Sequence, residues 1–339
     1  MRKLLGPGVV FCLFVLVVGS LSAQQPARDS CPESITSCGC VINSTGTYTV
    51  ANNLSATQTN RPNCIEITAD HSILNLKGFQ VLGNANGTGI GIWIHRGADH
   101  VVVEGSDEGS GQLYAPDTAC TPGGSEGIVS RWNVAIEDDA DNAVIERFDA
   151  LGGFAQNPVG NTTAGLLINA NHAVAGNLNA CFNGVAGVIL RQSTGSTLFN
   201  MSANSNLEVG VWFDTSNQSD LATATADANG HYGIWLMRSS QNVVNNFDGS
   251  ANDIGTLVGC GDVHCTGNEG SDENRITSGG NHGNRNAGLV IQKHSHENIV
   301  TITTNDGSPN GQDMIDENPH CDSNTWYNNN GTTEEGCIH

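Results

Sequence analysis

The pattern of a glycine followed by three apolar residues recurs at Gly165-Leu-Leu-Ile168, Gly187-Val-Ile-Leu190, Gly210-Val-Trp-Phe213, Gly233-Ile-Trp-Leu236 and Gly288-Leu-Val-Ile291. An earlier copy begins at Gly91 and a weaker one at Gly255. From Gly165 to Gly255 the steps are 22 or 23 residues. Asparagines keep the same register: Asn183, Asn206, Asn229 and Asn284 precede a repeat glycine by four residues, and Asn177, Asn200 and Asn245 by ten. Two residue types in one register indicate an internal repeat.

The repeat unit is too short for a pair of helices, and its apolar residues do not follow a helical period. Short β-branched strands separated by Gly, Asn, Asp and Ser turns suit it instead. A unit of about 22 residues is typical of one coil of a parallel β-helix, whose coils stack about 4.8 Å apart. The sequence therefore predicts an all-β fold in which Gly187, Gly210 and Gly233 form one column and the asparagines join their amides along the stack.

Side chains alternate along a strand, so the first and third residues after each glycine should point into the coil and the second outward. The outward position is apolar throughout, with Trp93, Leu167, Ile189, Trp212, Trp235, Leu257 and Val290. Trp212 and Trp235 lie on consecutive coils, so their rings should stack. Three interpretations stay open: the chain itself covers this row, another copy associates with it, or the two tryptophans form an aromatic platform for sugar rings.

Charged residues lie just beyond the apolar row, namely His95, Arg96, Arg191, Asp214, Arg238, Lys293 and His294. We expect Arg191, Asp214 and Arg238 on three successive coils. One interpretation is a ladder of surface ion pairs, each contributing about 0–1 kcal/mol. The other is a carbohydrate site in which an arginine neutralises a uronate or sulfate group while a base removes a proton, with His231 or Tyr232 as candidate bases.

The densest acidic segment, Glu137-Asp138-Asp139-Ala140-Asp141, offers carboxylate oxygens of the kind that bind Ca²⁺. A solvated acidic turn is the alternative, because the segment lacks the Asp-x-Asp-x-Asp-Gly pattern. The segment His294-Ser295-His296, with Glu297, could hold a transition metal. No other cofactor is indicated, since the sequence contains no phosphate-binding loop, nucleophile elbow or dinucleotide fingerprint.

Residues 1–23 have the features of a secretory signal peptide: Arg2 and Lys3, an apolar run over Val9–Val18, and small residues up to Ala23. No second apolar stretch is long enough to cross a membrane. We therefore expect a secreted, periplasmic or cell-surface protein. With 13 Lys plus Arg against 34 Asp plus Glu, the net charge is −21. This charge argues against nucleic acid and anionic membranes as partners. The sequence does not indicate an oligomeric state.

Of the 11 cysteines, only Cys12 lies in the predicted signal peptide, and the even number that remains favours disulfides in an exported chain. Cys260 with Cys265 could close a small loop, and Cys321 with Cys337 could tie the C-terminal tail. A zinc site at Cys260, His264 and Cys265 is the alternative for the first pair.

Longer steps of the repeat mark insertions at residues 105–126, 152–163 and 259–273, which are rich in Gly, Pro, Asp or Ser and should be loops. Functional residues often lie on such loops. If the first insertion covers Trp212 and Trp235, the sugar-platform interpretation loses its main support.

Three further segments bear on the type of β-helix: Cys40-Val-Ile-Asn-Ser-Thr-Gly-Thr-Tyr48, residues 64–78, and Cys321-Asp-Ser-Asn-Thr-Trp326. With them the chain resembles the right-handed parallel β-helix proteins of the pectate-lyase-like class, in particular exported bacterial proteins with NosD-type repeats. The resemblance implies a right-handed single-stranded parallel β-helix of about ten coils over residues 65–305. It also implies an N-terminal cap over residues 24–64 and a disulfide-tied tail over residues 306–339.

The class includes lyases, hydrolases, epimerases and binding proteins, so it implies no single activity. The paired-Asp and Gly-His-Gly signatures of polygalacturonases and the Asp-Pro-His-Asp signature of alginate epimerases are absent from this sequence. We expect a protein that binds an extracellular or cell-wall polysaccharide at Trp212, Trp235, Arg191, Asp214 and Arg238. Lyase-type elimination is the expected chemistry if the protein is catalytic. The alternative is a non-enzymatic adhesion or structural β-helix, and the sequence does not decide between the two.

Overall fold

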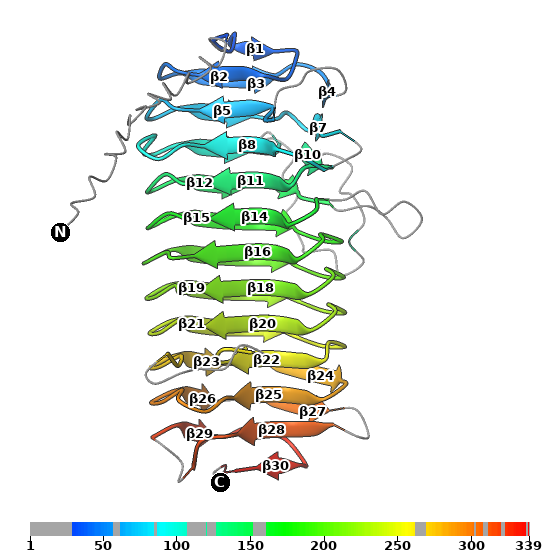
Figure 1. The fold of residues 1–339 in the computed structure, drawn as a ribbon, viewed down its shortest axis with the longest axis vertical. Helices are drawn as coiled ribbons and strands as arrows, with labels where there is room; N and C mark the ends of the chain where they lie inside the picture. The colour runs from blue at the N-terminus through cyan, green and yellow to red at the C-terminus, as the bar shows by residue number, and fades with distance from the viewer. Residues whose placement is uncertain are drawn as a thin grey trace, which may run out of the picture.

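The computed structural model describes residues 29–56, 62–84, 87–106, 120, 127–151, 161–261, 269–301, 303–307, 311–319, 323–336 and 338. The chain winds into coils that stack along its longest axis, with β1 at one end and β30 at the other (Figure 1). Neighbouring coils pair through parallel strands. The fold is a right-handed parallel β-helix, which confirms the predicted fold class. Within the described residues, no helix has the length and hydrophobicity that crossing a bilayer requires.

Sheet A contains 12 strands, each paired with the equivalent strand of the next coil. They are β2 (Cys40–Ile42), β5 (Ile65–Ile67), β8 (Ile90–Ile94), β11 (Val134–Asp138), β14 (Ala164–Ile168), β16 (Ala186–Arg191), β18 (Val209–Asp214), β20 (Tyr232–Met237), β22 (Ile254–Val258), β25 (Ala287–Ile291), β28 (Gln312–Asp316) and β30 (Glu334–Glu335). The repeat glycines lie in these strands. The register places Gly187 beside Gly210, and a Cβ added to Gly210 would lie 2.6 Å from the Gly233 carbonyl oxygen. The predicted glycine column is confirmed.

Sheet B contains 18 strands and forms the rest of each coil. They are β1 (Ser34–Ile35), β3 (Thr47–Val50), β4 (Leu54–Ser55), β6 (Ile73–Asn75), β7 (Gln80–Leu82), β9 (Val102–Glu104), β10 (Gly127–Ser130), β12 (Val144–Glu146), β13 (Phe148–Asp149), β15 (Val174–Asn179), β17 (Thr197–Ser202), β19 (Asp220–Thr225), β21 (Val243–Asp248), β23 (Arg275–Thr277), β24 (Gly280–Asn284), β26 (Ile299–Thr301), β27 (Thr304–Gly307) and β29 (Thr325–Tyr327). Both β12 and β13 pair with β15, so a single longer strand there replaces two short ones.

The interior of the coils is a continuous apolar core, as the alternation of side chains predicts. In β16, Val188 and Leu190 belong to this core, whereas Ile189 between them belongs to a second apolar cluster on the outer face of sheet A. Trp235 and Leu257 occupy the same outward position in β20 and β22. The predicted inward and outward positions of the repeat are therefore confirmed.

The coils extend beyond the predicted repeat region of residues 65–305. At the N-terminal end, β2 and β3 already pair in parallel with the next coil. At the C-terminal end, β28 continues sheet A, and β29 continues sheet B. Apolar residues of this tail, such as Trp326, are buried against the core, which explains why the winding does not stop at residue 305.

Three disulfides have both partners among the described residues: Cys31–Cys40, Cys38–Cys64 and Cys120–Cys181. The first two tie the N-terminal coils together. Cys260 also takes part in a disulfide. Its predicted partner Cys265 and the predicted pair Cys321–Cys337 lie outside the described residues, as do the predicted signal peptide and most of the insertion at residues 105–126.

Buried asparagines form the ladder that the repeat predicts. Each donates its side-chain N–H to the amide oxygen one coil further on, from Asn161 to Asn183 at 2.9 Å, from Asn183 to Asn206 at 3.0 Å and from Asn206 to Asn229 at 3.1 Å. The amide oxygen of Asn206 also accepts the backbone N–H of Asn183 at 2.9 Å. The ladder satisfies polar groups that would otherwise be buried without partners.

The second predicted asparagine column differs by one residue. Asn200 donates to Asn177 at 2.7 Å as expected. Asn245 does not continue this column, because it lies opposite Ala222, and Asn246 occupies the equivalent position. The step from Gly233 to Gly255 is one residue shorter than the step before it. The residue ten positions before Gly255 is therefore Asn245, whereas the residue that belongs to the column is Asn246.

Replacing Asn206 by Ala should destabilise the protein by about 3 kcal/mol, because it leaves two buried N–H donors of Asn183 without an acceptor. Chemical denaturation of the two proteins measures this difference. The exposed Asn43 provides a matched control, since its replacement by Ala should change stability by less than about 0.5 kcal/mol. Equal effects of the two substitutions would contradict a stabilising ladder.

Candidate functional site

Trp212 and Trp235 lie opposite each other and stack as predicted, with ring centroids 4.9 Å apart and planes inclined by 8°. They do not form an open platform, however. Trp235 is only 9% exposed, and its indole N–H donates to the Gly259 carbonyl at 2.9 Å. Leu257 on the next coil is fully buried. This burial favours the interpretation in which the chain itself covers the row at Trp235 and Leu257. Trp212 is half-buried, and the sugar-binding role of the two tryptophans stays a prediction.

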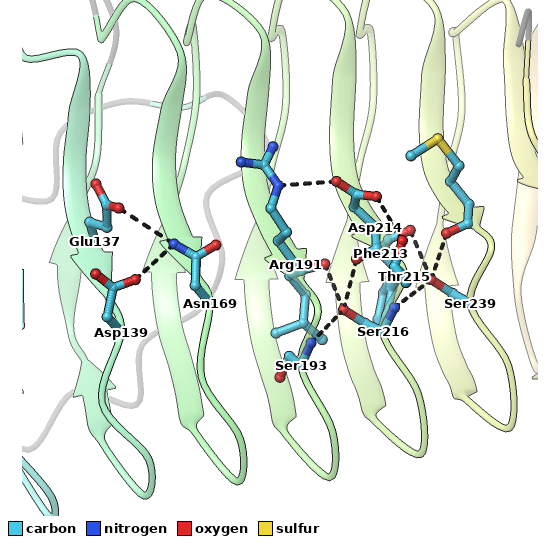
Figure 2. A network of polar contacts seen from close by, with 12 residues as sticks. Glu137, Asp139, Asn169, Arg191, Ser193, Phe213, Asp214, Thr215, Ser216 and Ser239 are labelled. Carbon is cyan, nitrogen blue, oxygen red and sulfur yellow. Dashed lines mark hydrogen bonds and ion pairs between the residues drawn. The ribbon is translucent and has the colours of Figure 1, made fainter. Parts of the chain in front are cut away.

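The predicted charged row holds for two of its three members. Arg191 and Asp214 lie opposite each other, and the Arg191 Nε is 3.0 Å from the Asp214 carboxylate (Figure 2). Arg238 is out of line, because Met237 lies opposite Asp214. In the sequence, Arg191 and Asp214 each follow their repeat glycine by four residues, whereas Arg238 follows Gly233 by five. This one-residue difference moves Arg238 from the strand into the turn.

On the coils that precede Arg191, the outer face of sheet A carries charged and polar side chains beside apolar ones such as Leu167. Glu66, Trp93 and Glu137 occupy the outward position in register on three neighbouring strands. The outward position two residues later holds His95, then Asp139, then Asn169. We call this group the polar cluster; it comprises Glu66, Trp93, His95, Glu137, Asp139, Asn169, Arg191 and Asp214.

A single amide joins the two acids at the centre of the polar cluster. The Asn169 Nδ2 donates to Asp139 Oδ1 at 2.9 Å and approaches Glu137 Oε1 at 3.4 Å (Figure 2). The other oxygen of Asp139 accepts the indole N–H of Trp93 at 2.9 Å. Asp139 therefore accepts hydrogen bonds at both oxygens, which is how an ionised carboxylate is held in place.

A histidine adjoins this pair of acids. The His95 Nε2 lies 3.0 Å from Glu66 Oε2, and the other oxygen of Glu66 accepts from Asn63 at 2.6 Å. The Trp93 ring stacks against the imidazole with centroids 3.8 Å apart. These contacts fix the orientation of His95, so its position relative to the two acids is set by its neighbours.

Burial raises the pKa of the half-buried Glu137 carboxyl, and the negative charge of Asp139 raises this pKa further. The positive charges of Arg191 and His95 act in the opposite direction. Glu137 is therefore a carboxyl that holds its proton to a higher pH than an exposed glutamate. Groups perturbed in this way by burial and specific charges are common at catalytic sites.

Replacing Arg191 by Gln should raise the pKa of Glu137 further, because it removes a positive charge that favours the ionised carboxylate. NMR titration of carboxyl-labelled glutamate in the variant and the parent protein measures this shift. Arg238→Gln is the matched control, since Arg238 lies outside the polar cluster. A Glu137 titration that moves to lower pH, or that moves equally in both variants, would contradict the proposed charge coupling.

The acids predicted to bind Ca²⁺ do not converge. Asp138 points into the coil, where it is fully buried between Ile94 and Ile168 of the neighbouring strands, and burial raises its pKa to about 8. Glu137 and Asp139 point outward, on the opposite face of β11. Among the described residues, no group of three or more His, Cys, Asp or Glu side chains is placed to hold a metal ion, and this includes the segment from His294 to Glu297.

The candidate base His231 lies away from the polar cluster, with its Nδ1 3.5 Å from Asp253 Oδ2. Tyr232 packs against the Trp235 ring instead of facing an acid. Sequence reasoning therefore identified Glu137, Asp139, His95, Arg191 and Asp214, but divided them between a calcium site and a row of ion pairs. It missed Glu66 and Asn169. Glu66 occupies the outward position that Trp93 occupies on the next coil, and Asn169 occupies the one that Arg191 occupies on the next coil. The repeat register could therefore have identified both residues.

No protein-family model matches the chain, and no curated protein matches its sequence. Several solved structures are similar to it. The Dettilon tailspike protein is 11% identical with a TM-score of 0.47, over 85% of this chain and 60% of that one. A protein of Geobacillus virus E2 is 12% identical with a TM-score of 0.49, over 84% and 51%. A periplasmic alginate epimerase is 13% identical with a TM-score of 0.45, over 86% and 75%.

These likenesses concern the fold alone. This chain spans 60% and 51% of the first two proteins, so their complete architectures are larger than the part they share with it. The predicted resemblance to right-handed parallel β-helix proteins is confirmed at this level. The NosD-type repeats stay a prediction. Any activity has to be argued from the residues of this chain.

Proposed function

We propose that the protein binds a polysaccharide at the polar cluster, on the outer face of sheet A, and hydrolyses its glycosidic bonds there. The observation that carries the proposal is the carboxyl pair held by one amide, in which Glu137 has a raised pKa and Asp139 accepts hydrogen bonds at both oxygens. A protonated carboxyl beside an ionised one is the pair that most glycosidases use.

In this mechanism Glu137 donates its proton to the glycosidic oxygen as the bond between that oxygen and the sugar carbon breaks, and Asp139 attacks the carbon to form a glycosyl ester. Water then attacks the same carbon, Glu137 takes a proton from the water, and the bond to Asp139 breaks. Glu137 lies in β11, Asp139 directly follows this strand, and Asn169 Nδ2 contacts both carboxyls. Because Asn169 Nδ2 lies 3.4 Å from one carboxyl oxygen and 2.9 Å from the other, these two oxygens are at most 6.3 Å apart. Retaining glycosidases hold their carboxyls about 5–5.5 Å apart and inverting enzymes about 6.5–9.5 Å apart. We therefore expect cleavage with retention of configuration.

The surrounding charges favour hydrolysis over the elimination expected from the sequence. Elimination requires a cation that neutralises the uronate carboxylate, but the candidate cation, Arg191, pairs with Asp214. The polar cluster contains four acids against Arg191 and His95, and the whole chain carries a net charge of −21. A polymer of uronates would be repelled by this field. A neutral or cationic polysaccharide would not.

A panel of neutral, cationic and uronate polysaccharides tests the proposal, with reducing ends and ultraviolet-absorbing unsaturated ends measured on the same samples. Hydrolysis yields reducing ends without unsaturation, and this is the expected result. Unsaturated products from a uronate polymer would establish elimination instead. Binding with no product from any member would favour the non-enzymatic alternative, an adhesion or structural β-helix.

We also propose that the protein acts outside the cytoplasm. The disulfides Cys31–Cys40, Cys38–Cys64 and Cys120–Cys181 support an oxidising compartment. Sequencing the N-terminus of the protein recovered from the medium or periplasm tests this. A start at Gln24 would agree with cleavage after Ala23.

A further inference from the structure

A pocket of about 430 Å³ opens beside the polar cluster, over the turns that follow β8, β11, β14 and β16. Asp139 and Asn169 belong to both the pocket and the polar cluster. The pocket therefore adjoins the carboxyl pair directly, so a sugar unit seated in it would be joined to the unit at the pair.

Unequal turn lengths create this pocket. The backbone N–H of Asn171 donates to Asp141 and that of Thr194 donates to Asn171, which identifies equivalent turn positions on three coils. Asp99 is the equivalent position on the coil before these three. The turn segments that end at Asp99, Asp141, Asn171 and Thr194 are, in that order, His95–Ala98, Asp139–Ala140, Asn169–Ala170 and Arg191–Ser193. The two middle turns are the shortest, so they lie recessed between the two longer ones. The extra residues Arg96 and Gln192 form the opposing walls.

The pocket carries more negative than positive charge. Asp99, Asp139 and Asp141 line it, against the single cation Arg96. No ion pair to Asp99 or Asp141 occurs among the described residues. Carboxylates are hydrogen-bond acceptors, so the pocket suits a ligand that brings hydrogen-bond donors and positive charge.

We infer that this pocket is a subsite for an amino sugar with a free, positively charged amine, next to the sugar at the cleavage pair. The inference rests on the proposed function, because it names the substrate class of the same site. An ammonium group donates up to three hydrogen bonds and offsets the excess negative charge of the pocket, whereas a uronate would add to it. The net charge of −21 also attracts a cationic polymer over a distance.

Calorimetric titration with oligosaccharides of one length tests the inference, using a glucosamine oligomer with free amines, its N-acetylated counterpart and a uronate oligomer. Binding is measured on Glu137→Gln protein, in which the loss of the acid slows turnover. The free-amine oligomer should bind at least about tenfold more tightly than the acetylated one, as expected for one charge-assisted contact. Adding Asp99→Asn and Asp141→Asn should abolish this preference. Asp220→Asn, a matched change on an exposed residue of sheet B, should preserve it.

Equal affinity for the free-amine and acetylated oligomers, a preference for uronate, or no binding by any of the three would overturn the subsite. The proposed hydrolysis can fail or succeed separately. Cleavage of neutral polymers without an amine preference would reject the subsite and retain the hydrolase. Amine-dependent binding that needs Asp99 and Asp141, without cleavage by the parent protein, would retain the subsite and reject the hydrolase.

Discussion

Replacing Glu137 by Gln should lower kcat for polysaccharide cleavage by about 100- to 10,000-fold and change KM little, because the amide cannot donate the proton that the leaving oxygen requires. The substituted side chain keeps an oxygen for the contact with Asn169, which lies 3.4 Å away in the parent protein. The fold and the substrate-binding face should therefore survive the change. Steady-state kinetics on the best polysaccharide of the panel measures the loss.

The role of Glu137 as an acid can be separated from a structural role by the choice of leaving group. The phenolate of an aryl glycoside leaves without protonation, so kcat/KM of the variant for this substrate should stay close to that of the parent protein, whereas kcat falls because Glu137 also activates the water of the second step. Glu208→Gln is the matched control, since Glu208 is exposed and lies outside the polar cluster. Equal losses on the activated and natural substrates would show that Glu137 supports the site without acting as its acid.

Replacing Asp138 by Asn should remove a strong pH dependence of stability. Asp138 is fully buried, one of its oxygens has no hydrogen-bond partner, and burial raises its pKa from 3.8 to about 8. The asparagine can still accept the backbone N–H of Ala140, which lies 3.0 Å from the other oxygen. It resembles the protonated acid in shape and carries no charge at any pH.

The sign of the effect follows from the proton that the folded state keeps. Below about pH 4 the acid is protonated in both states, so it adds no pH dependence. As the pH rises towards 8, the unfolded chain loses this proton while the folded state retains it. The parent protein should then lose stability relative to the variant, by up to about 1.4 kcal/mol per pH unit.

Thermal or chemical denaturation of both proteins at several pH values from 4 to 8 measures this difference. The variant should match the parent near pH 4 and become progressively more stable above it. Asp141→Asn provides the control, since Asp141 is exposed in the following turn. A constant difference across the pH range would mean that Asp138 is ionised in the folded protein.

The sequence was most informative where each coil repeats the one before it. A period of 22 or 23 residues can be read from the sequence. Because the coils stack, residues separated by one period lie next to each other in the structure. The glycine column, the ladder through Asn183 and Asn206, and the stacked pair of Trp212 and Trp235 follow from that period alone. The prediction weakened wherever one step changed length. Asn245 was misplaced by a single residue for this reason, whereas Arg238 was misplaced because it follows its repeat glycine by five residues instead of four.

The repeat alone thus determined the β-helix, the direction of its side chains and the vertical columns, because a strand pair of fixed register needs only the spacing between equivalent residues. Which columns are covered, and which acids meet, was decided by the tertiary structure. Trp93 and Asp139 are 46 residues apart, with a step of irregular length between them, so their contact depends on the number of residues between the two strands. The pocket likewise arises from turn lengths compared across four coils. Burial raises the pKa of Glu137 and of Asp138. This burial arises only when neighbouring coils pack against each other, so it cannot be read from one coil alone.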